Sequence, residues 1–160
     1  MGISLKGRRK GSMKKVRFIF SILGTLVFIV YMAVLIKATL FSFNEYVYGR
    51  SANLVLFDSI RLMWRSEDDW LILKNIIGNV LLFVPFGLLL PLIYRVFNSW
   101  RFIFIFGFGT SFIIEVLQYE YFKRIFDIDD IFLNGMGAML GLFLYKFLAM
   151  LFRWIERLLK

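Results

Sequence analysis

The sequence contains no cysteine and no histidine. These absences exclude thiol nucleophiles, metal sites built from cysteine or histidine, haem ligation through histidine, and every mechanism in which imidazole moves a proton. Proline is scarce as well, with two residues among 160. Any chemistry must therefore use carboxylates, carboxamides, hydroxyls, lysine or arginine.

Apolar residues, by contrast, are abundant. Hydrophobic residues make up 60% of the chain, including 20 phenylalanines, and the mean hydropathy is +0.74. Soluble domains use about 45–50% apolar residues, so the composition indicates a membrane protein. The net charge of +9 does not indicate nucleic acid, because seven of the 20 basic residues are concentrated in the first 17 residues, at the start of the first apolar run. Such a block is typical of a cytoplasmic anchor to anionic lipids.

A membrane-spanning helix needs about 20 mostly apolar residues, and the sequence has four such runs. They cover about 16–40, 71–96, 100–119 and 131–151. The sequence therefore predicts an all-α polytopic membrane protein, with a bundle of four transmembrane helices over 16–151. The other segments are a basic N-terminal segment, a polar loop between the first two spans and a basic tail: 1–15, 41–70 and 152–160.

Three details of these segments carry predictions of their own. The first run is longer than the 7–15 residues of a signal-peptide core and no A-x-A site follows it, which favours an uncleaved anchor.

Pro85 and Pro91 each remove a backbone donor from the second span, so we expect that helix to be kinked. Residues 54–64 of the loop are apolar but too short to cross the membrane. They fit an interfacial or re-entrant helix and a packed loop equally well.

The distribution of lysine and arginine predicts the orientation. With the N-terminus in the cytoplasm, 13 of the 20 basic residues fall on the inner side, and nine of the 11 acidic residues fall on the outer side. Both termini are therefore expected in the cytoplasm, with the loop 41–70 outside.

Polar side chains inside spans are costly in lipid and mark candidate sites. They form three sets, on the second span, on the third span, and around the start of the fourth: Asn75 and Asn79; Ser111, Glu115 and Gln118; Arg124, Asp127, Asp129, Asp130 and Asn134. Spacings of three and four residues place each of the first two sets on one helical face. Because successive spans run in opposite directions, we expect all three sets to converge near the extracytoplasmic surface. The first span is expected to contribute an anchor and little else.

Each set also has a structural interpretation. The aspartates can cap the fourth helix, the two asparagines can bond across helices, and Ser111 is interpreted as a packing residue. Gly137 and Gly141 have the spacing of small residues that lets helices approach closely. Glu115 is the hardest residue to explain structurally, because a carboxylate in lipid needs a cation, a partner such as Arg124, or a bound proton.

Taken together, these sets resemble the VanZ family of bacterial membrane proteins. The likeness covers 75–141 and is carried by three motifs: Asn75-Ile-Ile-Gly-Asn79 with Pro85, Gly87 and Pro91; Ser111-x-x-x-Glu115-x-x-Gln118; and Arg124-x-x-Asp127-x-Asp129-Asp130-x-x-x-Asn134-x-x-Gly137 with Gly141. No single motif is specific, but three in this order on consecutive spans are. One departure is Lys123, where family members often carry glycine before the arginine.

The family is named for a protein associated with low-level resistance to the glycopeptide teicoplanin, and its biochemical mechanism is not established. The resemblance implies a protein of the bacterial plasma membrane, acting in glycopeptide resistance or cell-envelope modification at the extracytoplasmic face. Membrane lipids are the expected partners, together with cell-wall precursors or lipid-linked glycans. The oligomeric state is not predicted.

Two other functions remain open. An intramembrane enzyme acting on a lipid-linked or phospholipid headgroup substrate would use Glu115, Asp127 and Asp130 as catalytic candidates. These three and Asn134 offer oxygen ligands that suit a divalent cation such as Mg²⁺, and Arg124 would bind phosphate. No nucleophile stands out, so a non-enzymatic role is favoured. A small transporter or lipid flippase is the third hypothesis, weakened because the buried polar residues do not continue to the cytoplasmic half.

Overall fold

The computed structural model describes residues 4–41 and 51–159. Within these residues four helices are long and apolar enough to cross a membrane: Ser21–Leu40, Asp69–Ile93, Trp100–Phe122 and Ile128–Leu158. The prediction of an all-α polytopic bundle is confirmed. Loop residues 42–50, the side chains of the basic residues between 6 and 17, and Lys160 belong to predicted segments but lie outside the described residues.

The elements follow the apolar runs closely. The first span is the second half of α1 (Ser4–Leu40), and the loop holds a short strand, β1 (Ala52–Asn53), and a helix, α2 (Asp58–Arg65). The second span joins α3 (Asp69–Ile72), the π-helical turn η1 (Leu73–Ile77) and α4 (Gly78–Ile93). The turn η2 (Arg95–Asn98) leads to α5 (Trp100–Phe122), and β2 (Phe126–Asp127) leads to α6 (Ile128–Leu158).

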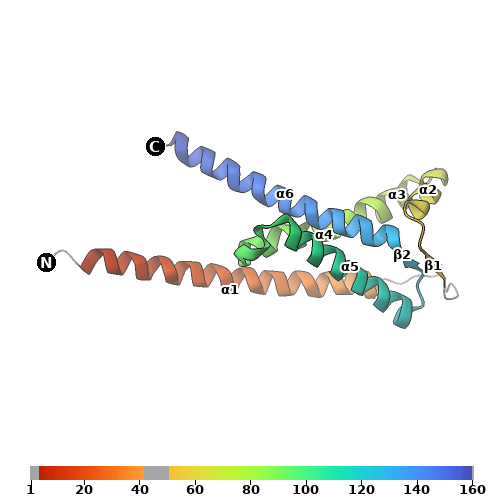
Figure 1. Cartoon of the computed structure of the whole chain (residues 1–160), viewed down its shortest axis with the longest axis horizontal. Coiled ribbons are helices and arrows are strands. Elements are labelled where there is room, and N and C mark those ends of the chain that lie inside the picture. The colour runs from red at the N-terminus through yellow and green to blue at the C-terminus, as the bar shows by residue number, and fades with distance from the viewer. Residues whose placement is uncertain (1–3, 42–50, 160) are drawn as a thin grey trace.

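The long helices run along the longest axis of the molecule, as Figure 1 shows. The start of α1 and the end of α6 lie at one end of the bundle, and α2, α3, β1 and β2 lie at the other, which we call the loop end. The core between the helices is fully apolar at its centre, where Leu35, Phe83, Ile103 and Leu142 are completely buried. The outer faces are apolar as well, as expected for side chains that contact lipid.

Glycines bring α4 and α6 into backbone contact. A Cβ atom built on Gly141 would lie 2.0 Å from the Val84 carbonyl oxygen, and one on Gly87 would lie 1.8 Å from that of Ala138. Gly137 is equally close to α4. Residues without a side chain allow this approach, and the approach places the polar groups of α4 directly opposite those of α6.

The second span is irregular in its first half. α4 continues as an α-helix through Pro85 and Pro91, and the predicted kink remains a prediction. The non-α segment is η1, a π-helical turn before the first proline. Such turns are rare in helices and are frequent at functional sites.

The loop between the first two spans is part helix and part packed segment. β1 pairs in parallel with β2, with Ala52 opposite Phe126 and Asn53 opposite Asp127. The Phe57 ring then packs edge-on against Phe132 of α6, with ring centroids 5.3 Å apart. The apolar stretch 54–64 therefore lies across the start of α6 and ends inside α2.

Candidate functional site

A cavity of about 280 Å³ lies among the four spans toward the loop end. We call it the bundle cavity. Seven of the ten polar residues that the sequence singles out line it: Asn75, Asn79, Glu115, Gln118, Arg124, Asp130 and Asn134. Ala38 and Thr39 of α1 and Lys74 of η1 line it as well. The three sets that converge in the predicted topology thus meet at one site.

Two carboxylates in this cavity connect three helices. Asp130 on α6 accepts a hydrogen bond of 2.6 Å from Asn79 Nδ2 on α4. Glu115 on α5, with 2% of its surface exposed, accepts one of 3.1 Å from the backbone N–H of Asp127. Hydrogen bonds from an amide to a carboxylate are stronger than those between neutral groups, so these contacts fix how α4, α5 and α6 are placed around the cavity.

Arg124 and Gln118 bind the end of the first span. Arg124 Nη1 and Gln118 Nε2 both donate to the carbonyl oxygen of Thr39, at 3.0 and 2.9 Å. The last carbonyls of a helix lack partners within it, and in lipid this lack is costly. The first span therefore does more than anchor the chain, contrary to the expectation from sequence. Among the described residues no ion pair joins Arg124 to Glu115.

Asn134 has a hydrogen-bonding capacity that the described residues do not use. Its Nδ2 donates to Ser111 Oγ at 2.8 Å, which ties α6 to α5. Its Oδ1 is buried and accepts no hydrogen bond from the described residues, although only 3% of Asn134 is exposed. Asn75 bonds within its own helix, donating to Leu71 O at 3.0 Å. Ser111 lies beside the cavity rather than on its wall.

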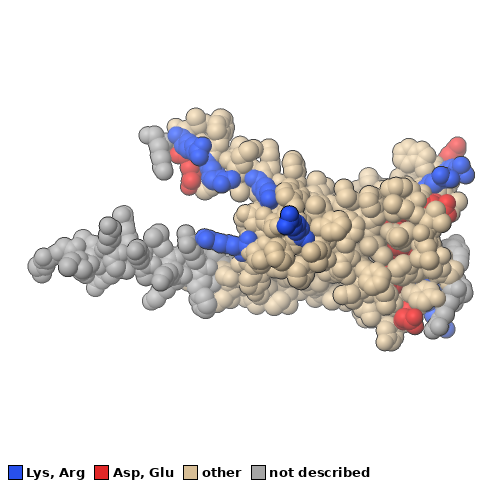
Figure 2. Space-filling view, viewed as in Figure 1, with Lys and Arg blue, Asp and Glu red and all other residues tan. Residues whose placement is uncertain are grey.

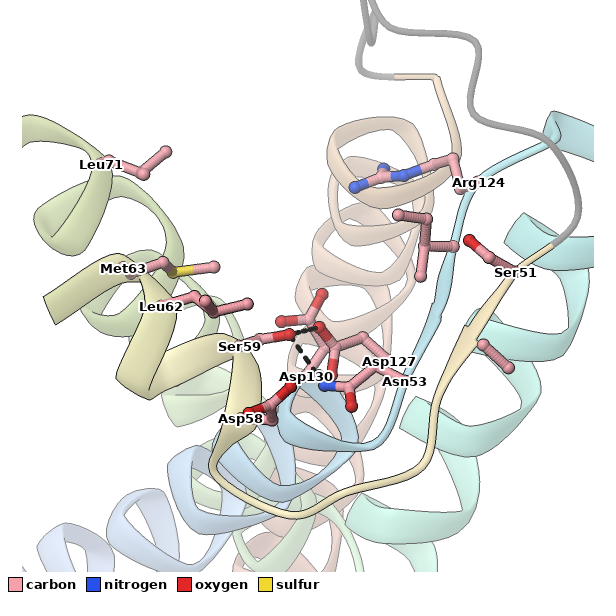
Figure 3. A pocket seen from close by; sticks show the side chains of 12 residues that line it. Ser51, Asn53, Asp58, Ser59, Leu62, Met63, Leu71, Arg124, Asp127 and Asp130 are labelled. Carbon is pink, nitrogen blue, oxygen red and sulfur yellow. Dashed lines mark hydrogen bonds between the residues drawn. The ribbon is translucent and has the colours of Figure 1, made fainter. Parts of the chain in front are cut away.

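Asp127 caps α6 and also binds the loop. Its carboxylate accepts from the Asp129 N–H at 2.9 Å, in the geometry of an N-cap. It also accepts from Asn53 Nδ2 at 3.1 Å and from the Ser59 hydroxyl. Figure 3 shows Asn53 and Ser59 converging on this aspartate.

Asp129 binds the start of α2. It is 1% exposed, and its two oxygens accept from the backbone N–H groups of Phe57 and Ile60. Phe57 has a positive φ of 67° and no side-chain cap of its own, so this carboxylate from a distant helix takes the place of a cap. Asp127 and Asp129 therefore hold the loop to the bundle, whereas Asp130 faces the bundle cavity.

A second and larger cavity, of about 630 Å³, lies between the loop and the bundle. We call it the loop pocket (Figure 3). Leu62, Met63 and Leu71 form an apolar side of this pocket. Arg124 and Asp130 line it and also line the bundle cavity, so these two residues stand between the two spaces.

The carboxylates that the structure describes do not gather as a metal site. Among the described residues no group of three acidic side chains is close enough to hold a metal ion. Asp127 and Asp129 are occupied by backbone and loop groups. A divalent cation held by Glu115, Asp127, Asp130 and Asn134 remains a prediction from the sequence alone.

Lys123 explains how the chain turns back after the third span. It has φ 52° and ψ 35°, the left-handed conformation that ends many helices. Its N–H and that of Arg124 both point to the carbonyl oxygen of Gln118. Glycine adopts this conformation at no steric cost, which explains why glycine suits the position. Lys123 adopts it nonetheless, and the turn aims Arg124 toward Thr39.

Four apolar helices arranged around a buried polar cavity define a multi-pass integral membrane protein. The model of the VanZ/LLP1 family matches residues 28–152, and the chain therefore belongs to this family. The resemblance read from the three motifs is confirmed. The match begins within α1 and includes every residue of the bundle cavity. No match was found among curated proteins or solved structures.

Proposed function

We propose that this VanZ-family protein acts at the extracytoplasmic face of the bacterial cell membrane, with the bundle cavity as its working site. Its action changes the cell envelope so that glycopeptides of the teicoplanin type become less effective. The supporting observation is the convergence of seven polar residues from three distant stretches of sequence on one cavity. Buried polar groups in a membrane are costly and are kept where they serve a function.

The distribution of charge supports this orientation. Most acidic side chains of the described residues gather at the loop end, whereas lysine and arginine side chains stand both there and around the far half of α6 and the turn at η2 (Figure 2). Over the full sequence, 13 of the 20 basic residues fall on the side of the two termini. Basic residues favour the cytoplasmic side. The loop end, with both cavities, then faces the outside, where glycopeptides and exposed cell-wall precursors meet.

The chemistry of the cavity favours binding over catalysis. It offers two carboxylates, two basic side chains and several carboxamides, which together can hold a polar group by hydrogen bonds and charge. Neither cysteine nor histidine is present in the chain to act as a nucleophile or as a histidine base. Holding a polar envelope component is therefore the function that these residues support best.

The test is a complementation experiment. A host lacking its own VanZ-family gene receives the wild-type chain, Glu115→Gln or Asp130→Asn, and the inhibitory concentration of teicoplanin is measured beside membrane abundance. Glu156→Gln, near the end of α6, is the matched control because its side chain is exposed and far from the cavity. We expect both cavity variants to lose the protection at unchanged abundance. Unaltered susceptibility on expressing the wild-type chain would refute the proposed function.

A further inference from the structure

The bundle cavity has more hydrogen-bond acceptors than the described residues satisfy. Glu115 accepts from the Asp127 N–H, and Asp130 accepts from Asn79 Nδ2. An ionised carboxylate has about four acceptor positions, so these two hydrogen bonds use only part of the capacity of the two groups. The Oδ1 atom of Asn134 accepts no hydrogen bond from the described residues, and only 3% of the surface of Asn134 is exposed. Buried acceptors of this kind call for a ligand that donates hydrogen bonds.

The same cavity also has unused donors. Arg124 uses one of its five N–H groups on the Thr39 carbonyl. Lys74 is exposed on η1 and lines the cavity. A guanidinium beside an ammonium is suited to phosphate. Because two carboxylates and two basic side chains line the cavity, their formal charges cancel, and a zwitterion complements them better than an ion of either sign.

Size and charge narrow the class of ligand further. At about 280 Å³ the bundle cavity lies just below the range of roughly 300–1,000 Å³ found for ligand sites, so it suits one small headgroup rather than an oligosaccharide. Once a phosphate engages Arg124 and Lys74, a hydroxylated neutral group supplies donors but no positive charge for the carboxylates, and a buried carboxylate left without a counter-charge is costly. A quaternary ammonium supplies the charge but has no N–H to donate.

We propose that the bundle cavity binds the headgroup of a phospholipid in which a primary ammonium lies beside the phosphate, as in phosphoethanolamine. The ammonium donates to Asp130, Glu115 and Asn134 Oδ1, and the phosphate lies toward Arg124 and Lys74. The inference rests on the proposed function, because both take the bundle cavity as the working site. Arg124 and Asp130 also line the loop pocket (Figure 3), so the proposed site adjoins that pocket at the loop end.

The test measures binding of three short-chain phospholipids to the purified full chain in detergent by isothermal titration calorimetry. The lipids carry phosphoethanolamine, phosphocholine or phosphoglycerol headgroups on the same dihexanoyl chains. Phosphocholine keeps the positive charge without an N–H, and phosphoglycerol keeps the hydroxyl donors without a positive charge. We expect at least tenfold tighter binding of the phosphoethanolamine lipid than of either other lipid. Equal binding of all three, or a preference for phosphoglycerol or phosphocholine, overturns the inference.

Two variants locate the selectivity. In Asp130→Asn the preference for phosphoethanolamine should fall to about twofold or less, whereas Glu156→Gln on the same helix should retain it in full. A preference that survives unchanged in Asp130→Asn shows that the headgroup binds elsewhere and overturns the assignment to this cavity. The comparison of three lipids in the unaltered chain decides the ligand class even if Asp130→Asn fails to fold.

The two proposals fail in different ways. If the unaltered chain prefers the phosphoethanolamine lipid but gives no protection against teicoplanin, the proposed function is wrong and the ligand assignment stands. If it gives protection that depends on Asp130 but shows no selectivity among the lipids, the ligand assignment is wrong and the proposed function stands.

Discussion

Replacing Gly141 by alanine should separate α4 from α6. The added Cβ would lie 2.0 Å from Val84 O, 2.9 Å from Leu88 N and 3.0 Å from the Cα of Gly87. All three atoms belong to backbone, so no side chain can rotate away, and the helices must move apart. Overpacking of this kind costs about 1–3 kcal/mol, and the rigid contacts favour the upper part of that range.

The net loss is smaller, because alanine is also the better helix former. Alanine in place of a glycine inside a helix gains about 1 kcal/mol, which leaves a net loss in the free energy of unfolding of about 1–2 kcal/mol. Gly109→Ala is the matched control, since nothing lies within 4 Å of a Cβ built there. It should gain up to about 1 kcal/mol from helix propensity alone. The two variants should therefore differ by about 2–3 kcal/mol.

The difference can be measured by titrating the purified chain with SDS in mixed micelles and following its helicity by circular dichroism. Four tryptophans give a second, independent signal. If Gly141→Ala unfolds at the same SDS fraction as Gly109→Ala, the backbone contact between α4 and α6 does not exist in the folded protein.

Three further predictions concern the turn after α5, the loop and the orientation. Lys123→Gly should raise the free energy of unfolding by about 0.5–1 kcal/mol, because glycine adopts the left-handed backbone conformation without strain. Lys123→Ala should not raise it, and equal free energies for the two variants would refute this prediction. Asp129→Ala leaves two backbone N–H groups of the loop unpaired and should lower the free energy of unfolding by about 1–3 kcal/mol. Proteolysis of the loop should then be faster, and an unchanged rate of cleavage would contradict the contact between Asp129 and the loop. In this cysteine-free chain, an impermeant maleimide added to whole cells should label Ser66→Cys and spare Ser99→Cys; the opposite pattern inverts the orientation.

The helical spans could be predicted because apolar length is a local property of sequence. The predicted span 100–119 and the observed Trp100–Phe122 begin at the same residue. The convergence of Glu115 on α5 with Asn79 on α4 follows from alternating span direction alone, without any knowledge of contacts. Span ends were less predictable: α6 continues to Leu158, because its last turns mix arginines with apolar residues and give no clear stop signal.

The partners of the polar residues could not be predicted. Thr39 contributes a backbone carbonyl, and every residue has one, so no sequence pattern marks it. Asn53 meets Asp127 in a two-residue strand pairing across 74 positions of sequence, and two residues are too few to show a period. Ser59 reaches the same aspartate from α2. The sequence also does not show which aspartate binds the loop and which lines the cavity. Only the contacts show that Asp129 holds the loop and Asp130 faces the cavity.

The carbonyl of Thr39 has a consequence for how the first helix behaves in the membrane. The guanidinium of Arg124 that binds this carbonyl also borders both cavities. If a ligand phosphate shifts this guanidinium, it changes the hydrogen bond that holds the end of α1. Coupling between two binding equilibria is reciprocal. If a bound ligand weakens the contact between α1 and the bundle by some factor, then separation of α1 from the bundle weakens ligand binding by the same factor. On that condition, tension or thinning of the bilayer that displaces α1 would change the affinity of the site for its ligand.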